Sequence, residues 1–420
     1  MVRQLFLLRP GELRRLGPFF AFYLLLFTML SLGDGLSLSL FVHQVGVRHL
    51  PVYYAIAAVV NVLMMGLYIR WSRQVANLHF FHVIIGSSVL FYWLAWAFIQ
   101  NGHAQVTWYG LFFIGREISF NLVLLHFGGF LRDYFTQEES GRIMPIVYSA
   151  GRVGGMVGNV LLGALAERWG VLNLALVYCL LGFLCHGFVI LLKGIPALEE
   201  PADPEAKPQE SPVTQLAHFL RQSPFLQALS AVSLVFFIFR WLLHYQYNTF
   251  FETHFESDAA MASFLGWYGA ISLGLGAVIQ LFVVGRLIQW LGVMGCHQLY
   301  AAIMLFCSGL NMVAGGLWTA VFSRAVESEL RIVLRNPVQQ LLTNEFSKQR
   351  RKLARAWTMG ILAPVGTVIC AIGLGFLAPL PATLTGYWLP VGLLATAVMY
   401  GVVSQWLYQT HKSHTASHPG

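Results

Sequence analysis

Long apolar stretches separated by short polar breaks run through the whole chain. A stretch of about 20 apolar residues is long enough to cross a bilayer as an α-helix. Twelve stretches approach or exceed this length, at 16–41, 52–70, 79–100, 107–131, 144–166, 171–192, 224–251, 261–284, 293–315, 317–342, 354–378 and 385–408. The pattern predicts an all-α integral membrane protein with twelve transmembrane helices.

One polar segment, residues 193–222, divides these stretches into two sets of six. It is rich in Pro, Glu and Ala, which is typical of a solvated linker. The two sets resemble each other, because the fourth span ends in LRDYFTQEESGR and the tenth in LLTNEFSKQRRK, with Leu131 and Leu342 in corresponding places. We therefore expect two pseudo-symmetric six-helix bundles, residues 1–192 and 223–410, a cytoplasmic linker at 193–222 and a disordered cytoplasmic tail at 411–420.

Composition excludes an ordinary soluble domain, because 57% of the residues are hydrophobic and only 10% are charged. The net charge of +8 does not indicate a nucleic-acid partner, since no basic stripe with interleaved aromatic residues lies outside the spans. If both termini lie on one side of the membrane, that side carries 18 Lys and Arg residues and the other only Arg48 and Arg168. Basic loops stay in the cytoplasm, so we expect a multi-pass protein of the cytoplasmic (inner) membrane with both termini cytoplasmic.

The chain shows no pattern typical of a metal site or an enzyme. Its five cysteines stand singly in apolar stretches, and the histidines of the tail are sparse. No nucleophile and base form a recognisable pair. We expect no metal, no cofactor and no enzymatic activity, and a monomer in the lipid bilayer.

Charged residues inside the spans are the strongest functional signal, because each costs at least about 2.5 kcal/mol without a partner or water. Six arginines and four acids qualify: Asp34, Arg116, Glu117, Arg152, Arg240, Arg324, Glu327, Glu329, Arg331 and Arg335. The excess of positive charge favours an anionic small-molecule substrate, because guanidinium groups suit phosphate and carboxylate.

Half of these charges lie in the single span LWTAVFSRAVESELRIVLRNPVQQLLTNEF, residues 317–346. At about 100° per residue, Arg324, Glu327, Arg331 and Arg335 share an arc of roughly 80°, while Glu329 points elsewhere. Glu327 can pair with Arg324 or Arg331 within the helix. This row of charged residues on one helix face is thus as consistent with a structural gate as with a binding site. We also assign Arg152 and Arg335, near the cytoplasmic ends of their spans, to gating.

Arg116 and Arg240 lie deeper in their spans and have no obvious partner on their own helices. With Arg331 they are our candidates for contact with the anion. Glu117 and Asn121, one turn apart, can line the same cavity, and Glu117 and Glu327 can act as switching partners of the arginines.

Two further segments carry candidate chemistry. Asp34, between two glycines in SLGDGLSLS, is a candidate proton site, and the alternative is a carboxylate tied to an arginine such as Arg240. In RWLLHYQYNTFFETHF, Tyr245 and Gln246 can bind substrate, whereas Tyr247 and His254 are expected to be membrane-boundary anchors. The glycines of the fifth span, Gly151, Gly154, Gly155, Gly158 and Gly163, predict close helix packing.

The whole chain resembles the major facilitator superfamily in its spans, duplicated halves, linker and Gly-rich fifth span. Of that family's loop signature, LYIRWSRQVAN keeps Arg70 and Arg73, and VGRLIQWLG keeps Gly285, Arg286 and Gly292. Two short stretches resemble the bacterial and plastid ATP/ADP carrier group, DYFTQEESGRIMPIVYSAGRVGGMVG and HYQYNTFF. The matching positions are Asp133, Phe135, Arg142, Pro145, Gly151, Gly155, Tyr245, Gln246 and Phe250. The intramembrane lysines of that group are missing here, and His244 stands where it commonly has an acid.

These observations predict a secondary active transporter that moves an anionic organic solute, of the organic phosphate, nucleotide or carboxylate type, by alternating access between the halves. Protons or a counter-substrate would couple the cycle. Two alternatives remain open at this point: a proton-coupled exporter of amphipathic compounds or lipids, and a transporter-like membrane sensor acting through the linker.

Overall fold

A computed structural model describes residues 12–71, 77–102, 105–196, 212–377 and 382–417. The described residues are almost entirely helical and contain no strand. The central part of the predicted linker and the last residues of the predicted tail lie outside them.

The first half contains α2 (Glu12–Gln44), η1 (Val47–His49), α3 (Leu50–Trp71), α4 (Asn77–Gln100), α5 (Gln105–Phe130), η2 (Leu131–Asp133), α6 (Gln137–Trp169) and α7 (Leu174–Leu192). The second half contains α8 (Pro212–Gln222), α9 (Pro224–His254), α10 (Asp258–Ile279), η3 (Gln280–Val284), α11 (Gly285–Val313), α12 (Leu317–Ala325), η4 (Val326–Arg335), α13 (Asn336–Asn344), α14 (Lys348–Arg355), η5 (Ala356–Ile361), α15 (Leu362–Leu377) and α16 (Ala382–Ser417).

Nine helical segments of the described residues qualify as membrane spans by length and apolar composition. One of them, Asp258–Val313, holds two of the predicted spans, because Gly292 breaks it with a φ of 70°. Two more long helices are less apolar than a span requires by this measure: α6, and the continuous helix of α12, η4 and α13, which carries five charged residues. Together these account for the twelve helices predicted within the described ranges.

Contacts between Cα atoms divide the chain into two compact units. Unit 1 comprises residues 1–46, 59–204 and 255–274, and unit 2 comprises residues 47–58, 205–254 and 275–420. Each unit thus includes a short segment that belongs by sequence to the other half.

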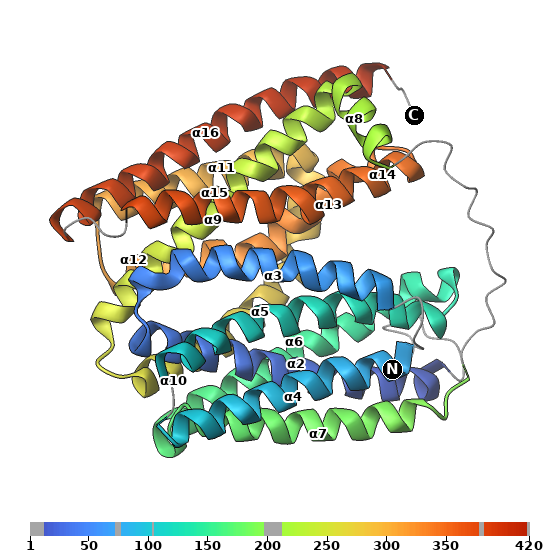
Figure 1. The fold of residues 1–420 in the computed structure, drawn as a ribbon. Helices are drawn as coiled ribbons and strands as arrows, with labels where there is room; N and C mark the ends of the chain where they lie inside the picture. Colours follow the sequence, from blue (N-terminus) through green and yellow to red (C-terminus); the bar gives the residue numbers. More distant parts are fainter. Residues whose placement is uncertain (1–11, 72–76, 103–104, 197–211, 378–381, 418–420) are drawn as a thin grey trace. The chain divides into compact units, whose positions relative to one another are not determined.

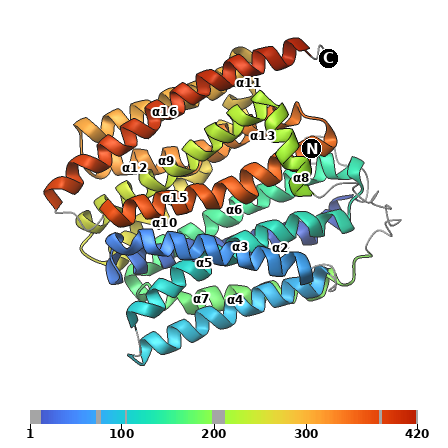
Figure 2. The ribbon, with the colours of Figure 1, turned by 45° about the horizontal axis from the view of Figure 1, so that its top comes forward.

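The helix pairs within the units repeat, as a duplicated sequence predicts. In unit 1, α2 packs on α5, α6 and α7, and α4 packs on α7. In unit 2, α9 packs on α12, α15 and α16, and α11 packs on α16. The views in Figures 1 and 2 both show α16 beside α9 and α11. Helices one, three, four, five and six of each set therefore take the same mutual arrangement.

Glycines allow the closest of these contacts, as the sequence predicts. A Cβ atom at Gly154 would meet the carbonyl oxygen of Leu24, and one at Gly158 would meet that of Thr28. The backbones of α2 and α6 therefore touch, which only glycine permits. The prediction of close packing is confirmed.

Local signals fix the ends of α6. Thr136 caps its N-terminus by accepting from the Glu139 N–H at 3.3 Å, and the Glu139 side chain accepts from the Thr136 N–H at 3.0 Å. This capping box satisfies two backbone donors that have no partner inside the helix. Gly170, with a φ of 78°, ends the helix in a conformation that favours glycine.

Two segments are more helical than the sequence suggested. α8 forms inside the predicted linker, because Phe219 is buried and packs against Phe346 with ring centroids 5.2 Å apart. α16 continues to Ser417, into the segment predicted to be disordered.

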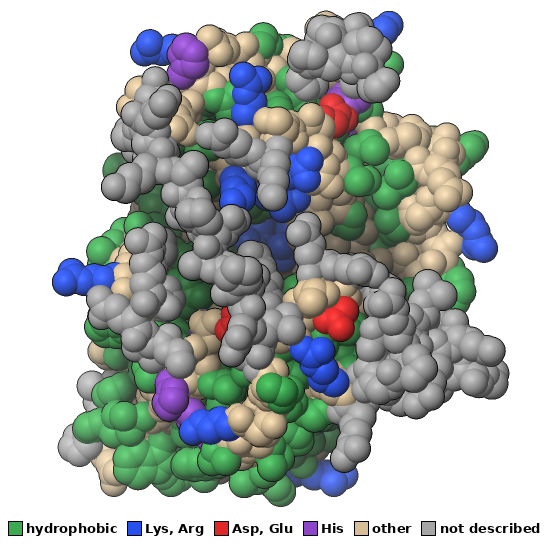
Figure 3. All heavy atoms as spheres, turned by 90° about the vertical axis from the view of Figure 1, so that its right-hand side faces the viewer, with side chains coloured by type: hydrophobic (Ala, Val, Ile, Leu, Met, Phe, Trp, Pro, Cys, Tyr) green, Lys and Arg blue, Asp and Glu red, His purple; other side chains and the backbone are tan. Residues whose placement is uncertain are grey.

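Figure 3 shows the side of Figure 1 on which α8 and α14 lie. Lys and Arg side chains are visible on this side, together with a few acidic ones.

Candidate functional site

A buried carboxylate, Glu327, holds together the charged side chains of unit 2. Its Oε1 accepts from Arg240 Nε at 2.6 Å, and its Oε2 accepts from the Tyr247 hydroxyl at 3.3 Å. Arg240 and Tyr247 lie two turns apart on α9, so both face η4. Glu327 is 6% exposed whereas Arg240 is 25% exposed. The carboxylate is therefore enclosed, and its arginine partner stays accessible.

A second arginine, Arg331, lies beside the same carboxylate, and Arg324 contacts its neighbour Tyr247. Arg331 Nε donates to the backbone oxygen of Glu327 at 2.7 Å and lies 4.0 Å from its Oε1. The Arg324 guanidinium lies over the Tyr247 ring, 5.5 Å from its centroid. The Glu327 carboxylate thus faces two guanidinium groups, those of Arg240 and Arg331.

Aromatic and polar side chains form a wall beside Arg240. Its guanidinium lies over the Trp241 ring at 4.8 Å, and Trp241 Nε1 donates to Thr367 Oγ1 of α15 at 2.7 Å. On the next turn, His244 Nδ1 lies 2.6 Å from the Tyr54 hydroxyl and 3.1 Å from Asn248 Nδ2. These contacts fix the face of α9 that presents Arg240.

The helix that carries Glu327 is wider than an α-helix at this point. η4 is a π-helical segment of ten residues, and its pattern ends with the Asn336 N–H bonded to the Arg331 oxygen, five residues back. Pro337 follows as the second residue of α13. Because the helix is continuous here, its missing N–H removes one hydrogen bond of the helix. The predicted arc assumed α-helical geometry throughout, so it does not describe the observed arrangement. Within η4, Glu327 and Arg335 are buried and Arg331 is half-buried.

Unit 1 carries a second charged group, built on Arg116. The Arg116 Nη1 pairs with Asp34 Oδ1 of α2 at 3.0 Å, and its Nη2 contacts the carboxylate of Glu117. Its guanidinium lies over the Phe113 ring at 4.6 Å. Arg116 is 8% exposed, while Asp34 is 45% exposed. The arginine is thus covered and shared by two acids.

This geometry corrects two expectations. Arg116 does have a partner on its own helix, the adjacent Glu117, and Asp34 is tied to Arg116 rather than to Arg240. Both partners lie within unit 1, at the level where α2 and α5 pack together.

Arg116 and Glu327 occupy equivalent places in the two repeats but carry opposite charges. Arg116 and Glu327 are 211 residues apart, the same separation as Leu131 and Leu342. Each unit thus has an ion pair between its first and fourth long helices. The arginine of the pair lies on the fourth helix in unit 1 (Arg116) and on the first helix in unit 2 (Arg240).

The excess positive charge identified in the sequence lies entirely in unit 2. Of the ten intramembrane charges, unit 1 contains two arginines and two acids. Unit 2 contains four arginines and two glutamates. Within the spans, unit 2 therefore has a formal charge of +2, and unit 1 has none.

Other predicted residues take varied positions. Asn121 is exposed, and its Nδ2 donates to Asn61 Oδ1 at 3.2 Å. Tyr245 and Gln246 are buried, and Gln246 Oε1 has no hydrogen-bond partner among the described residues. Arg335 is buried, and its guanidinium carbon lies 3.3 Å from the centroid of the Phe236 ring. Arg152 is half-buried on α6.

Tyr247 contacts Glu327 in the candidate site, and the sequence analysis did not predict this contact. Its expected role as a boundary anchor is wrong, because the ring is buried and its hydroxyl bonds to Glu327. The signal was present: Tyr247 lies seven residues after Arg240, on the same helix face. Tyr54 and Trp241 were missed because their contacts depend on the packing of distant segments.

Two similar sets of helices long and apolar enough to span a membrane, each with an intramembrane ion pair, define a multi-pass helical membrane protein. Residues 127–351 match the family model for the Major Facilitator Superfamily. This match covers more than half of the 420 residues, so the chain belongs to the Major Facilitator Superfamily. The predicted family, the helical membrane fold and the expectation of a transporter rather than an enzyme are confirmed. A comparison with curated proteins finds no match.

Solved transporter structures share the fold over nearly the whole chain. The nucleoside transporter NupG is 13% identical, with 94% of this chain and 99% of its own covered and a TM-score of 0.65. A bacterial homologue of the human lysosomal transporter Spinster, in an inward-facing and unoccupied conformation, is 14% identical, with 96% and 99% covered and a TM-score of 0.58. A bacterial homologue of the iron transporter ferroportin is 13% identical, with 94% and 99% covered and a TM-score of 0.64. Identities this low show the fold alone.

Proposed function

We propose that this secondary transporter moves an anionic organic solute by alternating access. The observation that carries the proposal is the group of arginines around one buried glutamate in unit 2. Arg240 and Arg331 remain partly exposed beside Glu327, and guanidinium groups bind phosphate and carboxylate through paired N–H donors. The substrate is an organic phosphate, a nucleotide or a carboxylate.

Glu327 acts in this proposal as an internal competitor of the anion. Without substrate, its carboxylate compensates Arg240, so that the site is not left with an uncompensated buried charge. An anion that approaches Arg240 and Arg331 replaces part of that interaction. The arginines exchange one acidic partner for another, and the ligand shifts the conformational equilibrium by its differential affinity for the two states. Arg324 keeps Tyr247 in place during the exchange.

In unit 1 we assign Asp34, Arg116 and Glu117 to coupling and gating. Two carboxylates share one arginine there, and Asp34 is the more exposed of the two. Asp34 can therefore take up a proton while Glu117 continues to compensate Arg116. Arg116 is less suited than Arg240 to bind the anion, because its charge is already shared and its side chain is covered. Asn121, Tyr245 and Gln246 are kept as substrate contacts, and Arg152 and Arg335 as gating residues.

We further propose that the protein is a monomer of the cytoplasmic membrane with both termini in the cytoplasm. The count of basic residues on the two sides of the predicted spans supports this orientation.

A thermal-shift screen with purified protein tests the substrate class. The probes are adenosine monophosphate, glucose 6-phosphate and citrate, with tetraphenylphosphonium as a lipophilic cation. A ligand that binds only the folded state stabilises it by RT ln(1 + [L]/Kd), so the melting temperature rises with the ligand concentration. We expect at least one anion to stabilise the protein, and Arg240→Gln to weaken its binding about tenfold or more, because one bond to a charged group is removed.

Arg221→Gln is the matched control, since Arg221 is an exposed arginine on a different helix, α8, and is in none of the ion pairs around Glu327. Stabilisation by the lipophilic cation and by none of the anions would contradict the proposal. Equal affinity of the Arg240→Gln protein and the wild type for the anion would also contradict it.

A further inference from the structure

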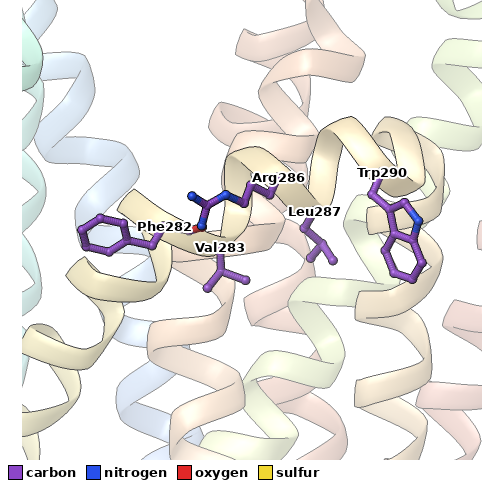
Figure 4. A pocket seen from close by; sticks show the side chains of 5 residues that line it. All are labelled: Phe282, Val283, Arg286, Leu287 and Trp290. Carbon is purple, nitrogen blue, oxygen red and sulfur yellow. The ribbon is translucent and has the colours of Figure 1, made fainter.

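A groove on the surface of unit 2 combines one arginine with exposed apolar side chains. Its volume is about 380 Å³, and it is lined by Phe282, Val283, Arg286, Leu287 and Trp290. Figure 4 shows that all five side chains project from one helix, where η3 continues into α11. Spacings of four residues place Phe282, Arg286 and Trp290 along one side of it.

Apart from Arg286, the groove presents apolar surface to its surroundings. Trp290 is 81% exposed and Phe282 is 58% exposed. One and two turns before Phe282, Val278 and Leu275 are exposed on the same side of α10. Apolar side chains this exposed on a membrane span contact lipid tails rather than water. The groove therefore continues as an apolar track toward the middle of the span.

Arg286 carries a charge that no acidic side chain of the described residues pairs with. Its Nη1 donates to the Phe282 backbone oxygen at 2.9 Å, within its own helix. None of the ion pairs found among the described residues includes Arg286. A guanidinium has five N–H donors, so several remain for an anion. An unneutralised charge at a lipid boundary is costly, and a bound anion lowers that cost.

The groove lies at the end of a span. Gly292 breaks the helix only six residues after Arg286, and the chain then turns back along α11. Tryptophan and arginine at this depth lie at the level of lipid headgroups. The phosphate of a lipid and the guanidinium of Arg286 are thus at the same height in the membrane.

We infer that this groove binds an anionic phospholipid. The phosphate accepts hydrogen bonds from Arg286, the Trp290 indole lies against the glycerol region, and one acyl chain follows Phe282, Val278 and Leu275. A soluble anion would use the arginine but leave the apolar track uncovered, whereas a phospholipid fits both parts. This lipid site is independent of the charged group around Glu327.

Native mass spectrometry of the purified full-length protein tests the inference. The protein is exposed to equal amounts of phosphatidylglycerol and phosphatidylcholine with identical acyl chains, and the lipid adducts are counted. We expect wild-type protein to retain phosphatidylglycerol over phosphatidylcholine by about fivefold, which corresponds to one arginine at the membrane surface. Arg286→Gln should bring this ratio close to one, and the control Arg221→Gln should leave it unchanged.

Three results would overturn the inference: no preference in the wild type, an unchanged preference in Arg286→Gln, or complete displacement of the lipid by inorganic phosphate. If Arg286→Gln does not give a monodisperse protein, Trp290→Ser tests the same groove. Unchanged retention of phosphatidylglycerol by that variant would equally overturn the site.

Discussion

Arg240 and Glu327 show how far single residues can be read from a sequence. Their positions inside apolar stretches marked them as candidate functional residues, because a lone charge there is costly. Their pairing could not be predicted, since it joins α9 to η4 across 87 positions of the chain. Partners on one helix follow from spacing alone, whereas partners on different helices depend on the packing.

At this scale the first prediction concerns the buried carboxylate. Glu327→Gln leaves Arg240 and Arg331 without their acid, and breaking a buried pair from one side costs about 3–5 kcal/mol. We expect a clearly lower melting temperature. The double variant Arg240→Gln/Glu327→Gln should recover part of the loss, because it removes the uncompensated charge as well. A double variant less stable than Glu327→Gln alone would contradict this account of the pair.

A second residue-scale prediction concerns the Tyr247 hydroxyl. Tyr247→Phe keeps the ring beneath Arg324 and removes the hydroxyl that bonds to Glu327, so we expect a loss of stability of about 1–2 kcal/mol. Chemical or thermal unfolding of the purified protein measures it. Tyr387→Phe is the control, because Tyr387 is exposed on α16. Equal effects of the two substitutions would show that the Tyr247 hydroxyl does not support Glu327.

At the scale of elements, the apolar pattern predicted the helices well and their internal geometry poorly. The span from residue 317 is the expected single helix, but its centre is the π-helical η4. Apolar periodicity gives no sign of this, because the widening depends on how the helix packs and on Pro337 after it. Close contact between α2 and α6 was predictable, since small residues one turn apart have a direct packing meaning.

The glycines of α6 give the element-scale prediction. Gly154→Ala places a Cβ against the carbonyl oxygen of Leu24, so α2 and α6 must move apart. Overpacking of this kind costs about 1–3 kcal/mol, which should appear as a lower melting temperature and lower yield. Gly187→Ala on α7 is the matched control, because a Cβ there meets nothing within 4 Å. Equal stability of the two variants would contradict the close contact.

At the scale of the whole molecule, duplication explains why equivalent helices pair in the same way in both units. The sequence showed the repeat only at Leu131 and Leu342 and in the following Gly-rich spans. The structure extends it to the ion pairs, in which Arg116 and Glu327 occupy equivalent places. A charge reversal between repeats is invisible to a comparison that looks for similar residues.

The orientation of the molecule is also open to a direct test. The five native cysteines are buried and free, so a cysteine placed on the surface dominates labelling. We expect Arg168→Cys to react with a membrane-impermeant maleimide in intact cells, and Arg221→Cys to react only after permeabilisation. The opposite result would place the termini outside the cytoplasm.

Uptake by proteoliposomes tests the central claim, anion transport through the arginines around Glu327, most directly. With the anion that gives the largest thermal shift, we expect saturable uptake by the wild type and by Arg221→Gln. Arg240→Gln and Arg331→Gln should each lower uptake about tenfold or more, because each removes a charged donor to the anion. Undiminished uptake of the anion by both variants would contradict the account.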